Sequence, residues 1–553
     1  MSLPQFSSQG CLFSTAALGP ELFAEADRYR LFAQKIYPLL AKARGALAQA
    51  YCDDNGRPAA EPVVLLGVSL LQFLEGVPDR QAVEMLRYHA GWNFALNRQL
   101  GQELFHPTTL TYFRQRLIAH GLSGLVFESI LQGLKEAGLV ERRGAQRLDS
   151  MQIFGLVSRM SRLECVRETL RLALQSIDES SGRWERPGFW KEYWERYVET
   201  KLDYRSEAGS LKEKMDHAGR DGWELLDWIK KLKHPELEAS SAVPLLERVW
   251  KENFVRAPDQ TIRQSDCQPP GAVPNPHDPE AQWAAKGHGQ NKQEHVGYKL
   301  QVAETVGSEA VKKGEPTPGF LTAVVTQPAI GSDDAGFDAV QEEQAALGLE
   351  QPKEIFIDAA YVSARRLAEA QAQGRELIGP AQAAPSRAGR YSPEDFQISV
   401  EDRVAICPAD KASTQCSRLV EEKTGKISYR FEWAGRCTDC ALKAKCLGAG
   451  QPHRTVTVGE HHTVLQARRQ EQKTEAFRRR CHKRNAIEGT QSELVRAHGA
   501  RRARYRGFQK MRWQNYLVGA ACNAKRWIRR MIWELKQAQI GAKASLHMGL
   551  AQA

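Results

Sequence analysis

Apolar residues recur at helical spacing through the N-terminal part of the chain, from about residue 21 to residue 140. One long amphipathic pattern covers 21–51, and a more continuously apolar pattern covers 62–76. Within 105–121, Pro107 and the two threonines after it mark the start of another helix. We therefore expect residues 1–140 to form an all-helical N-terminal domain.

The hydrophobic period changes to that of a strand at 141–157, where Asp149 shares one face with apolar neighbours. The helical pattern returns over 158–256, a stretch that holds six of the twelve tryptophans. We expect 141–157 to supply the first strand of a sheet. We expect 158–256 to be a helical insertion with its own small aromatic core.

Residues 257–387 begin with a loop rich in proline and glycine and continue with four strand-like runs. These runs are 295–305, 320–330, 354–362 and 376–380. Helical patterns separate the second run from the third and the third from the fourth. Strands separated by helices of this length predict an α/β sheet with some parallel strands.

Short strand-like pieces and a cysteine cluster occupy 388–470, which we expect to be a small β-rich insertion. Helical patterns dense in arginine follow over 471–540, with aromatic and aliphatic residues at core spacing in their second half. The last residues, 541–553, are expected to be a tail.

Charge is distributed unevenly along the 553 residues, whose formal net charge is +11. Residues 461–553 hold 21 basic and 5 acidic side chains, whereas the rest of the chain is slightly acidic. A basic region of this kind favours a polyanionic partner, and a solvated charged helix is the alternative interpretation.

Several classes of protein are excluded by composition. The 42% hydrophobic and 26% charged residues are typical of a globular protein of several domains. No uninterrupted apolar stretch reaches the length of a membrane span, and the first ten residues lack the pattern of a secretory signal. Eleven cysteines in this length are no disulfide framework. We expect a cytoplasmic protein without a membrane partner.

Three carboxylates lie at positions in the predicted strands and helices from which they could bind a metal ion. Asp149 lies in the first predicted strand, Asp358 ends the apolar run 355–357, and Glu488 lies in a cationic helix. Singly, each has a simpler explanation as a helix cap, a turn residue or a partner of Arg484. Together they match the ligand set of paired divalent cations, which are about 4 Å apart in phosphoryl-transfer enzymes.

The cysteine cluster reads Cys407-Pro, Cys416, Cys437-x2-Cys440-x5-Cys446. A CxxC pair with two further cysteines within reach fits a tetrahedral structural zinc site. Reduced cysteines without a metal are the alternative.

Five fragments, in order, resemble the DDE transposases of bacterial insertion sequences. They are PVVLLGVSLLQFLEGVPDRQAVEMLRYHAGWNFALN with FHPTTLTYFRQRL, LDSMQIFG, DPEAQWAAKG with HVGYKLQVAET, FIDAAYVSARRL with ELIGP, and KRNAIEGTQSELVRAHGARRARYRG. The first looks like the InsH-type N-terminal domain of these proteins. Within the family, the chain is most similar to the IS-four-like superfamily, in particular its IS-eleven-eighty-two-like group.

The resemblance implies an RNase H-like catalytic core with Asp149, Asp358 and Glu488 as its three acidic residues, holding two Mg²⁺ ions. It also implies that Cys407, Cys437, Cys440 and Cys446 are the preferred zinc ligands, with Cys416 as a substitute. The superfamily pattern around the glutamate is Tyr-x2-Arg-x3-Glu followed by a basic residue. Arg484 and Glu488 match it, Arg496 is one residue late, and Cys481 replaces the tyrosine. This replacement leaves open whether the chain is fully active.

Contacts to DNA are expected from two groups of arginines. The basic C-terminal region supplies Arg484, Arg496, Arg501, Arg502 and Arg504. Arg114 and Arg116 lie on the polar side of the predicted helix in 105–121, which is either a DNA-recognition helix or a packed bundle helix.

The function implied is that of a transposase that binds the ends of an insertion sequence, cleaves DNA strands and transfers them to target DNA. A domesticated or inactive transposase that only binds DNA is the alternative. The expected partners are double-stranded transposon ends, target DNA and a second copy of the chain in a synaptic complex. The expected location is the nucleoid.

Overall fold

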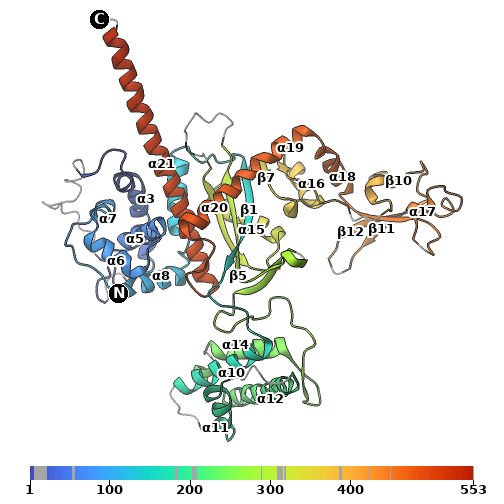
Figure 1. Ribbon diagram of the computed structural model, residues 1–553, viewed down its shortest axis with the longest axis horizontal. Coiled ribbons are helices and arrows are strands. Elements are labelled where there is room, and N and C mark those ends of the chain that lie inside the picture. The colour runs from blue at the N-terminus through green and yellow to red at the C-terminus, as the bar shows by residue number, and fades with distance from the viewer. Residues whose placement is uncertain are drawn as a thin grey trace.

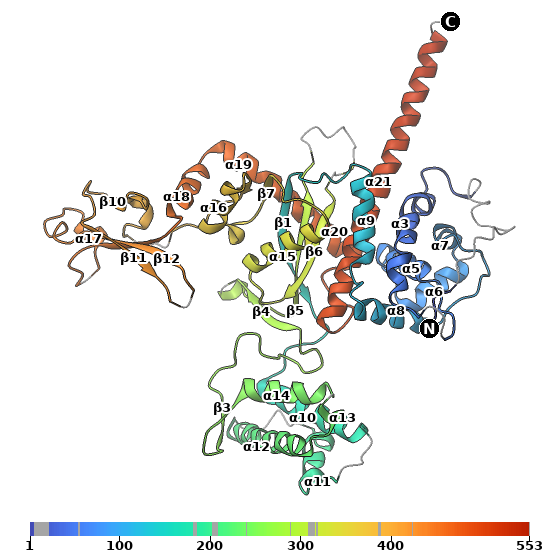
Figure 2. The ribbon, with the colours of Figure 1, turned by 180° about the vertical axis from the view of Figure 1, so that it is seen from behind.

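The computed structural model describes residues 1–4, 22–52, 56–180, 185–201, 208–238, 240–287, 289–307, 316, 319–384, 389–422, 424–448 and 450–551. A central sheet is flanked by the N-terminal helices, and two lobes project away from it (Figure 1 and Figure 2). Residues 5–21 of the predicted N-terminal domain, Trp184 of the predicted insertion and residues 552–553 of the predicted tail lie outside the described residues.

Six strands form the central sheet. They are β1 (Gln146–Phe154), β4 (Gln282–Lys286), β5 (Gln293–Thr305), β6 (Leu321–Pro328), β7 (Glu354–Phe356) and β8 (Glu376–Ile378). The order is β4-β5-β1-β7-β8, and β6 also pairs with β5. β5 is antiparallel to β1, β4 and β6, whereas β1, β7 and β8 are parallel. The predicted α/β sheet with some parallel strands is confirmed.

Both faces of this sheet are buried by helices, which explains its apolar strands. One face packs Leu148 and Ile355 against α15 (Asp333–Ala346) and α16 (Ala364–Ala372). The other face presents Met151 and Ile153 to the core that contains α20 (Ala486–His498) and α21 (Phe508–Ala551). Helix α21 lies along the sheet and then extends beyond the body of the molecule (Figure 1). It continues through most of the predicted tail.

The N-terminal region is helical, as predicted. Its helices are α2 (Arg28–Leu31), η1 (Phe32–Ile36), α3 (Tyr37–Lys42), α4 (Arg44–Ala48), α5 (Pro62–Glu75), α6 (Asp79–Tyr88), α7 (Ala90–Ala95), α8 (Thr108–Ala119) and α9 (Leu125–Glu136). α5 is buried along nearly its whole length, and α5 and α9 pack against α21. The amphipathic pattern of 21–51 is divided among short helices instead of forming one.

The stretch between β1 and β4 forms a separate helical lobe, at the bottom of Figure 1. It contains α10 (Arg162–Glu179), α11 (Trp190–Tyr193), η2 (Trp194–Glu199), α12 (Ala208–Leu232), α13 (Pro235–Glu238), α14 (Ala242–Asn253), β2 (Phe254–Arg256) and β3 (Ile262–Gln264). Trp190, Tyr197 and Trp250 belong to its own core, so the predicted aromatic core is present.

A second lobe follows β8 and is built from short strands. Its elements are η5 (Pro393–Asp395), β9 (Gln397–Ser399), β10 (Val404–Ile406), β11 (Gln415–Val420), β12 (Ile427–Glu432), α17 (Lys443–Cys446) and β13 (Thr455–Gly459). The chain returns to the sheet through α18 (His462–Glu471), α19 (Glu475–Cys481) and η6 (His482–Asn485), which lead into α20.

No single helix among the described residues has the length and apolar composition of a membrane span. Helices α5 and α6 pass this test only as a pair, and they are bent by 106° at the break between them.

Candidate active site

Two of the three predicted carboxylates lie at matching positions on adjacent parallel strands. The register pairs Gln146 with Ile355 and Arg147 with Phe356. Asp149 and Asp358 each follow by the same number of residues, and the backbone of Asp358 is still extended before η4 (Ala359–Tyr361). Because paired residues of parallel strands point to the same face, both carboxylates are directed towards the face covered by α20. The predicted strand 354–362 therefore ends early, and Asp358 stands at its end.

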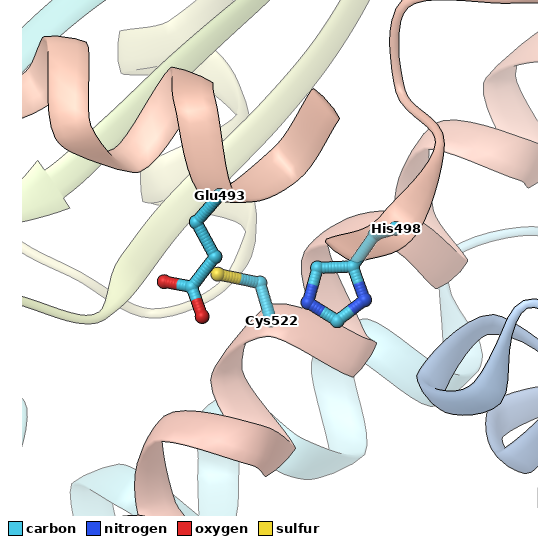
Figure 3. A group of neighbouring side chains, drawn as sticks. All are labelled: Glu493, His498 and Cys522. Carbon is cyan, nitrogen blue, oxygen red and sulfur yellow. The ribbon is translucent and has the colours of Figure 1, made fainter. Parts of the chain in front are cut away.

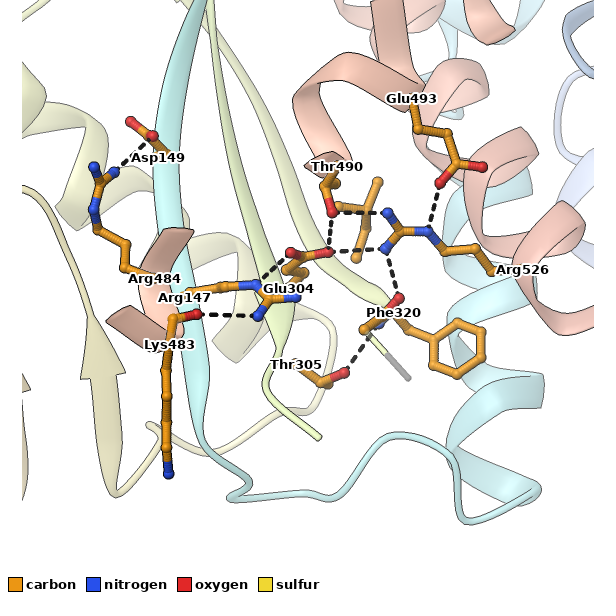
Figure 4. A network of polar contacts seen from close by, with 12 residues as sticks. Arg147, Asp149, Glu304, Thr305, Phe320, Lys483, Arg484, Thr490, Glu493 and Arg526 are labelled. Atoms are coloured by element: carbon orange, nitrogen blue, oxygen red, sulfur yellow. Dashed lines mark hydrogen bonds and ion pairs between the residues drawn. The ribbon is translucent and has the colours of Figure 1, made fainter. Parts of the chain in front are cut away.

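Asp149 is held by a cation. Its Oδ2 atom lies 2.9 Å from Nη1 of Arg484, and its side chain is 17% exposed (Figure 4). Burial raises the pKa of Asp149, and the charge of Asp358 adds to this rise. The amide of Ser150 and the Arg484 guanidinium act in the opposite direction.

The third carboxylate, Glu488, stands on the first turn of α20 and is exposed. Arg484 precedes it by one turn and contacts Asp149, and Gln491 follows by one turn and donates to the Ser150 carbonyl at 3.2 Å. Glu488 therefore lies on the side of the helix that faces β1.

A buried polar network holds this helix on the sheet, and no pattern in the sequence predicted it. Glu304 of β5 is fully buried and accepts from Arg147, Arg526 and Thr490 (Figure 4). Arg526 of α21 also donates to the Thr490 hydroxyl and to Glu493. The network thereby joins β1, β5, α20 and α21. Its member on α20, Thr490, is two residues from Glu488 in the sequence.

The arginines predicted to contact DNA lie in different surroundings. Arg496 and Arg502 are exposed. Arg501 donates to the carbonyl of Gln152, and Arg504 lies over the ring of Phe73.

The helix with the other two candidate arginines packs as a bundle helix. Arg114 is 4% exposed, pairs with Asp79 and lies over the rings of Tyr505 and Trp513. Arg116 lies over the Tyr51 ring. Arg114 is thus engaged within the protein, and the contact of these two arginines with DNA stays a prediction.

Cys481, which stands at the tyrosine position of the family pattern, packs against Phe356, Ile378 and Phe477. Burial raises the pKa of its thiol. Its side chain therefore fills an apolar site between α19 and the strands β7 and β8.

Four of the cysteines come together in the β-rich lobe. Cys407, Cys437, Cys440 and Cys446 line one cavity of about 20 Å³, which has room for a body the size of one water molecule. Burial raises the pKa of Cys446, and the three other thiols add to this rise. Cys416 lies on β11 and is absent from the cavity lining.

A tighter group of metal-ligating atoms lies elsewhere. In the part of the chain that the structure describes, Glu493, His498 and Cys522 bring three candidate ligand atoms within 4.8 Å of one another. Among the described residues, neither the three predicted catalytic carboxylates nor the four cysteines of the β-rich lobe reach this spacing.

Two protein-family models match parts of the chain. Residues 406–528 match a transposase DDE domain, a segment that includes Glu488 and the four cysteines but neither aspartate. Residues 21–116 match a transposase domain (DUF772). No curated protein and no solved structure matches the chain.

Proposed function

We propose that this chain is a DDE transposase that cuts DNA at the ends of its element and joins the released ends to target DNA. The matches to transposase domains over residues 21–116 and 406–528 support this proposal. The observation that carries the proposal is the matched position of Asp149 and Asp358 on adjacent parallel strands, beneath the helix that bears Glu488.

The topology of the sheet supports an RNase H-like core. Strands β6, β5 and β1 are antiparallel neighbours, and β7 and β8 follow β1 as parallel neighbours. The first acidic residue then lies on the central strand, the second at the end of the next strand, and the third on a covering helix. The helical lobe and the β-rich lobe are insertions into this core.

The donor set fits Mg²⁺, which prefers carboxylate oxygens and keeps several of its waters. Asp149, Asp358 and Glu488 would hold the ions. When bound, two such ions supply activation of the attacking oxygen and stabilisation of the leaving oxygen.

The remaining groups of the site bind and orient DNA. Arg484 neutralises Asp149 in the free protein and is placed to donate to a phosphate of bound DNA. The exposed Arg496 and Arg502 would bind phosphates that flank the cleaved bond. Arg501 and Arg504 shape this surface through their packing and add positive charge to it.

The proposed activity consists of two successive reactions. Water attacks the phosphodiester at the transposon end, its P–O bond breaks, and a 3′-hydroxyl is released. That hydroxyl then attacks a phosphodiester of target DNA, or first of the opposite strand if a hairpin forms. A P–O bond to the attacking 3′-oxygen forms, and the bond from the same phosphorus to the 3′-oxygen of the attacked strand breaks, which leaves a 3′-hydroxyl there. Because two ends must be brought together, we propose that a homodimer acts on them.

The β-rich lobe would hold a structural zinc ion. Four thiols around one small cavity suit the tetrahedral coordination of this metal. The ion would tie the loop of Cys407 to the segment 437–446 in a lobe whose own apolar core is small.

Incubation of the purified protein with a duplex carrying the element's end and Mg²⁺ tests the proposal. We expect nicks at the element boundary, followed by hairpins or joined strands. A protein that binds this duplex but yields none of these products would be the DNA-binding alternative, and the proposal would be wrong.

A further inference from the structure

Glu493, His498 and Cys522 form a cluster between two helices that the reaction described above does not use. The first two side chains project from α20, and Cys522 projects from α21 (Figure 3). A carboxylate oxygen, an imidazole nitrogen and a sulfur lie within 4.8 Å of one another.

The tautomer of His498 is fixed by its environment. Its Nδ1 atom lies 3.0 Å from the carbonyl oxygen of Phe73 on α5, and a carbonyl only accepts, so Nδ1 carries the proton. Nε2 is then a bare acceptor. It is buried without a hydrogen-bond partner in a side chain that is 1% exposed. Metal-binding histidines typically donate their other nitrogen to a backbone carbonyl in this way, so Nε2 is oriented as a ligand.

The two other groups complete a mixed ligand set. Cys522 is fully buried, and its burial raises the pKa of the thiol to about 12. Glu493 accepts at Oε2 from the Nε atom of Arg526, at 3.0 Å, and contributes one carboxylate oxygen to the cluster. Glu493 also lines a cavity of about 760 Å³ together with Thr490 and Arg526.

We propose that Glu493, His498 and Cys522 bind a structural zinc ion. Sulfur and imidazole nitrogen are ligands that zinc accepts and that Mg²⁺ does not favour, so this site differs from the catalytic one. The charges of a thiolate and a carboxylate balance a divalent ion, so no net charge is buried. The thiol must lose its proton on binding.

Neighbouring cations set the coordination of Glu493. Lys525 and Arg529 pair with Oε1, but their side chains are 25% and 59% exposed and can turn to solvent. Arg526 is buried and keeps Oε2, together with Glu304. Glu493 would therefore bind the ion through one oxygen.

The ion would fasten the catalytic helix. α20 carries Glu488 at one end and His498 at the other, so a metal bridge to α21 and the bond to Phe73 would hold the far end in place. This inference concerns the stability of the fold and does not depend on the proposed reaction.

Metal content after chelation and reloading with Zn²⁺ tests the inference on the full-length chain. The double variant Cys437→Ser/Cys440→Ser removes two thiols of the β-rich lobe, and we expect it to retain one zinc per chain. Adding Cys522→Ala should remove this zinc. Adding Cys165→Ala, which replaces the buried cysteine of the helical lobe, should not.

His498→Gln provides a second, independent variant, because a glutamine can still donate to Phe73 yet lacks the imidazole ligand. Loaded with Co²⁺, the double variant should show a thiolate-to-cobalt charge-transfer band that both Cys522→Ala and His498→Gln abolish. If the double variant binds no zinc, or if neither further change lowers its metal content, the proposed site is wrong.

Discussion

Arg484 and Asp149 form an ion pair across 335 residues of sequence, with 2.9 Å between Nη1 and Oδ2. The pair places a guanidinium on the carboxylate that we propose as a metal ligand. We expect Mg²⁺ to compete with Arg484 for Asp149, in which case the guanidinium would be available to a DNA phosphate.

Arg484→Gln should distinguish the effect of Arg484 on Mg²⁺ binding from its effect on the DNA phosphate. The Mg²⁺ concentration for half-maximal cleavage should fall, because the ion no longer competes with the guanidinium. The maximal rate should fall by about 10- to 100-fold, the equivalent of one charge-assisted hydrogen bond of about 1.5–3 kcal/mol. Cleavage rates over a range of Mg²⁺ concentrations measure both quantities. An increase in the half-maximal concentration would show that Arg484 assists metal binding instead.

Glu304→Gln should destabilise the protein strongly. The change leaves Arg147 and Arg526 buried without their carboxylate, and breaking a buried ion pair costs about 3–5 kcal/mol. Denaturation by urea measures the loss of free energy of unfolding. Glu369→Gln, which breaks the exposed pair with Arg365, is the matched control and should cost less than about 0.5 kcal/mol. Equal losses in both variants would contradict the role of the network.

Glu343→Gln should remove a pH dependence of stability. Burial raises the pKa of Glu343 on α15 from 4.5 to about 8 in the folded chain. Between these values the folded state keeps a proton that the unfolded state has lost, so stability falls as pH rises through this range. Melting temperatures measured below and above this pH range should differ less in the variant than in the unaltered chain. The exposed neighbour provides the control, since Glu342→Gln should leave the pH dependence as it is.

Arg496→Gln and Arg502→Gln should weaken DNA binding and its dependence on salt. Each lost phosphate contact should reduce the slope of log K against log salt concentration by about 0.9. Titrations of end DNA at several salt concentrations measure the slope. Arg365→Gln, on the opposite face of the sheet, should leave it unchanged. An unchanged slope in the first two variants would place the DNA elsewhere.

Several strands of the central sheet could be predicted because the signal of a strand is local. Alternation of apolar residues predicted β1, β5 and β6 nearly to their ends, and Asp358 stands out because it terminates a buried strand. Glu488 was recognisable only with Arg484 beside it, as part of a pattern that resembles a known family.

Partners distant in sequence could not be predicted. The helical period placed Arg114 on a polar face, but only the fold brings Tyr505 and Trp513 over it. In the sequence, Glu304 is a single polar residue near the end of an apolar strand. Its partner Arg526 lies 222 residues further along the chain. Periodicity assigns a side chain to a face, whereas the tertiary fold decides what covers that face.

The central claim is that Glu488 completes a metal-dependent catalytic site with Asp149 and Asp358. Its most direct test is Mg²⁺-dependent nicking of end DNA by Glu488→Gln, with Glu475→Gln as control, because Glu475 is an exposed glutamate of α19 in the same cationic region. We expect Glu488→Gln to bind the duplex as the unaltered chain does but to produce no nicks, and Glu475→Gln to nick normally. Normal nicking by Glu488→Gln would contradict the account.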